Sequence, residues 1–171
     1  MGTRSAIFKE QLDGTFLGIY CHWDGYIDGV GAILYKHYQN PEKIQQVIDQ
    51  GKGLSCLGVK PEVLYEYENI EYRQLTYCGW HEFCLYARKE TEVYCAQSLE
   101  EIRNFDYLTL TDEGRIDGWE EVVNGYKVFT PYRGSDNNGY LYVQRQTGEW
   151  LVSSIDSFGK MKPFEQLEQR F

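Results

Sequence analysis

Two stretches near the start of the chain have the hydrophobic and polar pattern of strands. Residues 3–8 become apolar after a polar start, and residues 15–23 alternate between larger apolar and smaller or polar positions. Alternation with a period of two is typical of a strand with one buried face. Asp13-Gly14, between the two stretches, is a turn signal typical of tight hairpins. The chain is therefore predicted to begin with a β-hairpin.

The apolar spacing then changes to that of helices. After a loop at 24–29, apolar residues recur at helical intervals, which predicts a helix over 30–38. Asn40 and Pro41 are a typical N-cap and first residue of a second helix, and Gly51 ends it. The apolar positions are Val30, Ile33, Leu34 and Tyr38 in the first helix and Ile44, Val47 and Ile48 in the second.

The rest of the chain mixes strands and helices without regular alternation. Ser98 and Glu101 form a capping box that opens a short helix, residues 119–123 are predicted as a helical turn, and residues 163–171 as a terminal helix. Strands are predicted at 72–78, 82–88, 93–96, 107–111, 126–131, 140–144 and 149–153. This order predicts the α+β class, with a mostly antiparallel sheet, an N-terminal β-hairpin followed by two helices, and a short C-terminal helix.

Length and composition fit one folded domain. The chain has 171 residues, of which 42% are hydrophobic and 25% charged, so residues 1–171 are predicted to form a single globular domain. The 17 Lys and Arg residues against 26 Asp and Glu residues give a net charge of −9. This charge argues against nucleic acid as a partner, because clustered cations bind phosphate backbones.

The sequence shows no pattern of export or membrane insertion. The N-terminus lacks the apolar core of a signal peptide, and no stretch reaches the ~20 apolar residues of a membrane span. The five cysteines are odd in number and irregularly spaced, which favours reduced thiols over a disulfide framework. We expect no membrane association and a cytoplasmic location.

The densest group of chemically versatile side chains lies in the segment from Tyr20 to Tyr26. If a strand continues through it, His22 and Asp24 point to one face, and the thiol and indole between them to the other. A His–carboxylate pair orients an imidazole for general-base work. The alternative is a structural strand end, with a turn at Asp24 and aromatic rings that fill the core.

The cysteines suggest two further chemistries, both weakly. Cys78, His81 and Cys84 carry donor atoms for zinc, and Cys95 or Cys21 could complete the set. The spacing lacks the paired Cys-x2-Cys unit that makes such a motif specific, so no metal site is predicted. No residue visibly lowers the pKa of the Cys21 thiol, which argues against a cysteine nucleophile.

Two loops have residues suited to anions. The glycines that precede the first helix offer backbone amides to an anion, or alternatively form a tight loop with positive φ angles. The polar loop 132–139 contains Arg133, which can clamp a phosphate or carboxylate, and Asp136. Acidic residues gathered at 112–121 are predicted to form a solvated face or to meet a basic partner. The glycines are Gly25, Gly29 and Gly31.

Parts of the chain also resemble a known group. Residues 1–5 (MGTRS), and residues 22–26 (HWDGY) before a helix, are similar to the start and central segment of small uncharacterised bacteriophage and prophage proteins. Residues 139–142 and 148–150 are similar to their closing hairpin. The resemblance brings no assigned catalytic residues. It implies a phage-encoded accessory protein that acts in the cytoplasm of a bacterial host.

These observations favour a non-enzymatic protein that binds a host macromolecule, with a host protein as the expected partner. A host-defence component is one candidate, which would make the chain a counter-defence inhibitor. One alternative is a small nucleotide- or anion-binding protein or hydrolase with its site around His22 and Asp24. Another is a virion-associated structural protein, and homo-oligomerisation fits all three. No catalytic residue or cofactor is predicted. The residues predicted to bind a ligand or partner are His22, Trp23, Asp24, Tyr26, Arg133 and Asp136.

Overall fold

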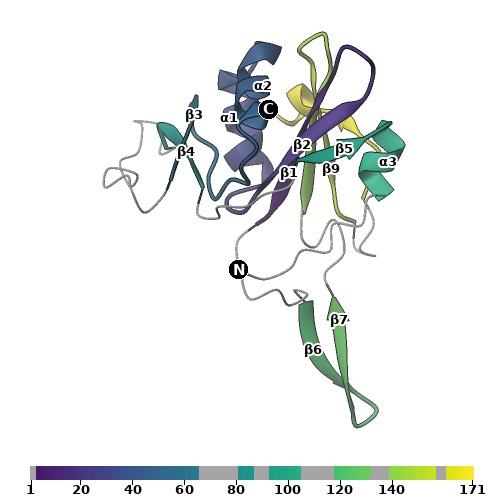
Figure 1. Ribbon diagram of the computed structural model, residues 1–171. Coiled ribbons are helices and arrows are strands. Elements are labelled where there is room, and N and C mark those ends of the chain that lie inside the picture. Colours follow the sequence, from purple (N-terminus) through teal and green to yellow (C-terminus); the bar gives the residue numbers. More distant parts are fainter. Residues whose placement is uncertain (1–2, 66–80, 87–92, 105–117, 132–138, 157–160) are drawn as a thin grey trace.

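The computed structural model describes residues 3–65, 81–86, 93–104, 118–131, 139–156 and 161–171. Within these residues, the main element is a six-stranded sheet in the order β10-β9-β8-β1-β2-β5 (Figure 1). Its strands are β1 (Ser5–Glu10), β2 (Phe16–Cys21), β5 (Tyr94–Ala96), β8 (Tyr140–Gln144), β9 (Trp150–Ser154) and β10 (Glu165–Gln166).

The predicted N-terminal hairpin is confirmed. β1 and β2 pair antiparallel along their whole length. In the turn between them, Gly14 has a φ of +86°, a left-handed backbone that glycine adopts without steric strain. The Asp13 carboxylate accepts the Thr15 backbone N–H at 2.9 Å, the usual way in which aspartate fixes such a turn.

The main sheet is mixed. β1 pairs with β8 in parallel, and Ser5 lies opposite Tyr140. The other neighbouring pairs of this sheet, β1–β2, β2–β5, β8–β9 and β9–β10, are antiparallel. The sheet is therefore mostly antiparallel, as predicted, and the central β1–β8 pairing is the parallel exception. That pairing joins segments far apart in the sequence, and no turn signal connects them.

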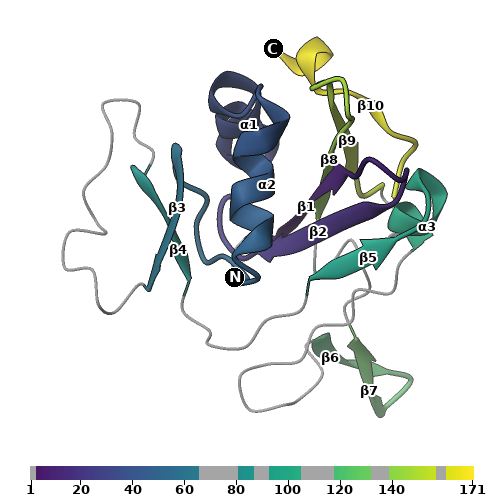
Figure 2. The ribbon, with the colours of Figure 1, turned by 45° about the horizontal axis from the view of Figure 1, so that its top comes forward.

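Two helices follow the hairpin, as predicted. A π-helical turn (Ile27–Gly31) runs directly into α1 (Ala32–His37), and α2 (Pro41–Asp49) begins after Asn40, whose side chain caps it. Both helices lie against one face of the main sheet (Figure 2). Their buried side chains pack with those of β1 and β2 in the larger of two core clusters, which includes Ile7, Ile19, Leu34, Ile44 and Tyr142.

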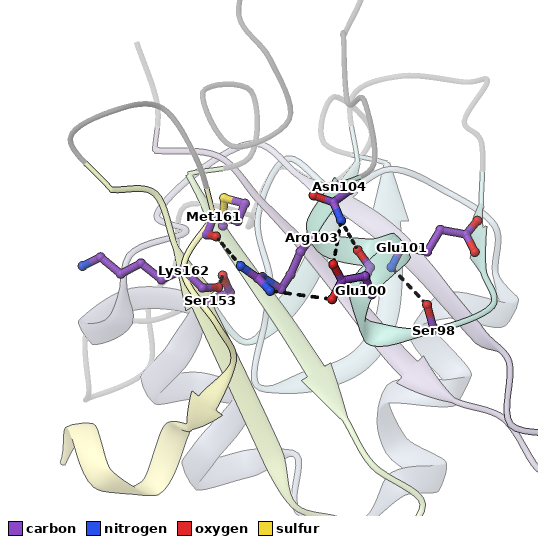
Figure 3. Close-up of polar contacts among 8 residues, drawn as sticks. All are labelled: Ser98, Glu100, Glu101, Arg103, Asn104, Ser153, Met161 and Lys162. Atoms are coloured by element: carbon purple, nitrogen blue, oxygen red, sulfur yellow. Dashed lines mark hydrogen bonds and ion pairs between the residues drawn. The ribbon is translucent and has the colours of Figure 1, made fainter.

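The second core cluster lies on the other face of the sheet. There α3 (Leu99–Asn104) buries Ile102 in one cluster with Phe8 of β1. The predicted cap is present, since the Ser98 hydroxyl accepts the Glu101 backbone N–H at 3.1 Å (Figure 3). The Arg103 guanidinium ties the helix to the segment after β9, because it donates to the Met161 carbonyl at 2.9 Å.

Two small sheets complete the described fold. β3 (Lys60–Tyr65) and β4 (Phe83–Tyr86) pair in parallel, and β6 (Gly118–Val123) and β7 (Tyr126–Pro131) form an antiparallel hairpin. β4 lies in the predicted strand at 82–88, whereas the predicted strands at 72–78 and 107–111 lie outside the described residues. Among the helices that the structure describes, none has the length and apolar character needed to span a bilayer.

Two predicted helical segments are wrong. Residues 119–123, expected as a helical turn, belong to β6 and pair with β7 across an Asn124-Gly125 turn. Both turn residues have positive φ, +52° and +84°, which is the geometry of a tight hairpin. Residues 163–171, expected as a terminal helix, contain β10 and a single 3-10 turn (Leu167–Arg170). Leu167 is the one buried residue of that turn, so the segment lacks the apolar face that stabilises a longer helix.

Candidate functional site

The chain leaves the main sheet just before the segment that the sequence singles out. β2 ends at Cys21, and the next two backbone N–H groups donate elsewhere: His22 to the Leu54 carbonyl at 2.9 Å and Trp23 to the Ser55 carbonyl at 3.0 Å. The alternation of faces assumed for a continuing strand therefore stops at Cys21. Cys21 is fully buried, whereas the Trp23 side chain is 43% exposed.

His22 and Asp24 do not form the predicted pair. The His22 Nδ1 atom lies 2.6 Å from the Tyr20 hydroxyl, and the Asp24 carboxylate accepts the Tyr26 hydroxyl at 3.3 Å. The negative charge of Asp24 raises the pKa of Tyr26, so the phenol stays protonated and keeps donating. The arrangement gives Asp24 no role in orienting the imidazole for general-base work.

Asp24 itself adopts the left-handed backbone region, with a φ of +59°. Non-glycine residues enter this region rarely, and such strain collects at functional segments where surrounding contacts fix the backbone. Here the Asp24 carbonyl accepts the Val30 N–H at 2.8 Å, which closes the loop onto the π-helical turn. The positive φ that the sequence led us to expect at a glycine thus falls on Asp24.

Gly25 anchors the loop to the body of the protein. Its N–H donates to the Thr3 carbonyl at 2.8 Å, and its own carbonyl accepts the buried Tyr142 hydroxyl at 2.6 Å. A Cβ atom at Gly25 would lie 2.8 Å from both the carbonyl carbon and the oxygen of Arg4. Glycine is therefore required here for a close approach of two backbones.

Gly29 plays a related part within the loop. A Cβ atom there would lie 2.3 Å from the Asp24 carbonyl oxygen. Of the three glycines at 25, 29 and 31, none has a positive φ. Gly25 and Gly29 allow close approach of the backbone, and Gly31 packs against the Tyr142 side chain.

The result is a fixed loop that displays aromatic and acidic side chains. We call residues His22–Asp28 the aromatic loop. Trp23 and Tyr26 are 43% and 42% exposed, and Asp24 and Asp28 are exposed beside them. The His22 ring packs edge-on against the Trp23 ring, with centroids 4.7 Å apart and an interplanar angle of 84°. Aromatic rings next to carboxylates suit contact with a partner's apolar and cationic side chains.

The other two residues predicted for the site, Arg133 and Asp136, lie outside the described residues. Their contribution stays a prediction. The structure does bring together the four remaining residues, because His22, Trp23, Asp24 and Tyr26 occupy one short loop.

The two buried cysteines, Cys21 and Cys84, are not suited to nucleophilic chemistry. The Cys84 thiol is buried and accepts the Gly58 backbone N–H at 3.2 Å, and burial raises its pKa to about 11. Burial also raises the pKa of Cys21. A thiol of raised pKa is a poor nucleophile at neutral pH because little of it is ionised.

The structure describes two of the three residues of the zinc hypothesis, His81 and Cys84. Cys78 lies outside the described residues, and His81 is half-buried two residues before β4. Within the described ranges, no group of three or more His, Cys, Asp or Glu side chains could hold a metal ion.

A second exposed feature is the β6–β7 hairpin, of which the sequence predicted only the strand at 126–131. Every residue from Glu120 to Val128 is exposed, including Val122 at 69% and Tyr126 at 75%. The signal that could have found it is Asn124-Gly125 between two β-rich stretches, the strongest short-range hairpin signature.

Comparison with protein-family models, with curated proteins and with solved structures finds no match to this chain.

Proposed function

We propose that the chain is a phage- or prophage-encoded accessory protein that acts by binding a host protein through the aromatic loop. A component of host defence is the class of partner that we favour, which would make the chain a counter-defence inhibitor. The observation that carries the proposal is a loop whose backbone is fixed by hydrogen bonds to the rest of the fold while the Trp23 and Tyr26 side chains are exposed to solvent.

Rigidity matters because binding is opposed by the loss of conformational freedom. A loop whose backbone is already fixed loses less on association than a flexible one. The backbone of the aromatic loop is hydrogen-bonded at several points to the rest of the fold, among them the N–H groups of His22, Trp23 and Gly25 and the carbonyls of Asp24 and Gly25. Trp and Tyr are the residues most often found at the energetic centre of protein interfaces.

The charges near the loop indicate the chemistry of the partner. Asp24 and Asp28 flank Tyr26, and the whole chain carries a net charge of −9. Opposite charges steer association and exclude partners of like charge. The proposed partner therefore offers Lys or Arg side chains beside an apolar patch.

The hydrolase or nucleotide-binding alternative has less support. It requires His22 and Asp24 to act on one ligand, whereas Tyr20 and Tyr26 are their hydrogen-bond partners. The virion-associated alternative stays a prediction, and purified particles would have to contain the protein.

The test is quantitative capture of proteins from a lysate of the bacterial host. Trp23→Ala and Tyr26→Ala are compared with wild type and with Leu12→Ala, a control whose side chain is 94% exposed in the β1–β2 turn. We expect both loop variants to lose a protein that wild type and Leu12→Ala retain, with unchanged circular dichroism. Equal capture by all four proteins would contradict the proposal.

A further inference from the structure

The β6–β7 hairpin is a two-stranded sheet that extends away from the main sheet (Figure 1). A lone two-stranded hairpin is marginally stable in water, because it has nothing on which to bury a face. Residues 120–128 nevertheless carry valines and a tyrosine, all of them exposed. A sequence of this kind is stabilised when a partner covers it.

The register of the hairpin sorts its side chains onto two faces. Glu121 lies opposite Val128, and Val123 opposite Tyr126. Because directly opposed residues point to the same face and successive residues alternate, these four share one face. We call it the apolar face. Its valines are 44% and 39% exposed, and its tyrosine 75%.

The other face is balanced in charge. Glu120, Val122 and Lys127 lie on it, and Val122 is directly opposite Lys127. Glu120 and Lys127 are therefore diagonal neighbours of opposite sign, close enough to offset one another. On the described part of the apolar face, by contrast, Glu121 is the one charged side chain.

We propose that the apolar face of the β6–β7 hairpin is a docking surface for a basic protein, whose apolar strip covers Val123, Tyr126 and Val128 and whose Lys or Arg pairs with Glu121. This inference rests on the proposed binding function and deepens it by adding a second contact surface for a partner of the same basic and apolar chemistry. Charge complementarity selects the occupant, because covering the apolar face desolvates Glu121 and a buried carboxylate needs a cation.

A second copy of the chain is the competing occupant, and the charges disfavour it. Two apolar faces packed about a two-fold axis would bring both Glu121 carboxylates into one apolar interface. The two chains, each with a net charge of −9, would also repel one another.

The experiment uses the full chain and two defined probes. Isotope-labelled protein is titrated with a short peptide of alternating Val and Lys, and with the matching peptide of Val and Glu, while backbone amide resonances are followed by NMR. We expect the Val/Lys peptide to shift the amides of residues 120–128 at ~20 mM salt, and the shifts to diminish at ~500 mM salt. The Val/Glu peptide should leave them unchanged.

Charge reversal provides the decisive variant. Glu121→Lys should lower the affinity for the Val/Lys peptide about tenfold and should bind the Val/Glu peptide, which wild type does not. An unfolded hairpin cannot produce this gain of binding. Glu168→Lys, an exposed residue of the C-terminal 3-10 turn, makes the same change in net charge and is the matched control. Tyr126→Thr keeps strand propensity while removing the ring, and it should weaken binding of the Val/Lys peptide.

Three results would overturn the inference. The first is an equal change in peptide affinity in Glu121→Lys and Glu168→Lys. The second is a set of peptide-induced amide shifts that lie outside residues 120–128, and the third is concentration-dependent self-association of the chain that Tyr126→Thr abolishes. Trp23→Ala, measured in the same titration, should bind the peptide as wild type does. A failure of the aromatic-loop proposal is therefore distinguishable from a failure of this one.

Discussion

The Tyr142 hydroxyl donates a 2.6 Å hydrogen bond to the Gly25 carbonyl, and this contact joins the centre of the main sheet to the aromatic loop. Tyr142 is fully buried in β8, and burial raises its pKa well above the usual range, so the hydroxyl remains a donor. The two residues are 117 positions apart in the sequence. The parallel β1–β8 pairing brings them together, because it places Tyr142 in a strand adjacent to the chain's first strand.

Removing that donor should loosen the loop. In Tyr142→Phe the buried Gly25 carbonyl loses its partner, and we expect the free energy of unfolding to fall by about 1–3 kcal/mol. Urea denaturation measures the loss. Tyr140→Phe is the matched control, because the Tyr140 hydroxyl makes no hydrogen bond among the described contacts; a loss of equal size in that variant would contradict the assignment.

Gly25 should tolerate no side chain. Gly25→Ala places a Cβ atom 2.8 Å from the Arg4 carbonyl group, and backbone atoms cannot yield as a flexible side chain can. We expect the free energy of unfolding to fall by about 1–3 kcal/mol or more, the range for overpacking. Gly14→Ala is the comparison, since a Cβ there meets nothing within 4 Å and the variant carries only the strain of a φ of +86°. The midpoint temperature of thermal unfolding should be lower for Gly25→Ala than for Gly14→Ala. The reverse order would show that the loop is not packed against Arg4.

The cysteines should differ sharply in reactivity. Cys95 is exposed in β5, whereas Cys84 is buried with a pKa raised to about 11. At pH 8 the Cys84 thiol is therefore almost wholly protonated, and its ionised fraction grows only as the pH approaches its pKa. Iodoacetamide labelling of the native protein, followed by peptide mass spectrometry, should modify Cys95 first and Cys84 after unfolding. Equal labelling rates in the native protein would place Cys84 at the surface.

The sequence predicted the elements that short-range rules govern. The Asp13-Gly14 turn, the Asn40 cap and the Ser98 cap all depend on residues within a few positions of one another, and each is present. The β6–β7 hairpin follows the same kind of rule at Asn124-Gly125, which favours pairing of residues 119–123 with the strand predicted at 126–131 over the helical turn that was expected there.

The candidate site was predictable in composition but not in geometry. His22, Trp23, Asp24 and Tyr26 lie in one loop, but their hydrogen-bond partners were not predicted. The strand ends at Cys21 because Leu54 and Ser55 accept the next two N–H groups, and those contacts join segments more than 30 residues apart. Alternation along one strand contains no information about such neighbours. The contact between Gly25 and Arg4 is of the same kind.

The most direct test of the central claim is site-specific photo-crosslinking inside the bacterial host. Trp23 is replaced by p-benzoylphenylalanine, which keeps a large aromatic group in the aromatic loop, and the same replacement at Leu12 serves as the control. If the loop is the binding surface, irradiation will join the chain substituted at position 23 to one host protein, and the chain substituted at position 12 will remain uncoupled. Crosslinks from position 12 to the same protein with equal yield, or none from position 23, would contradict the account.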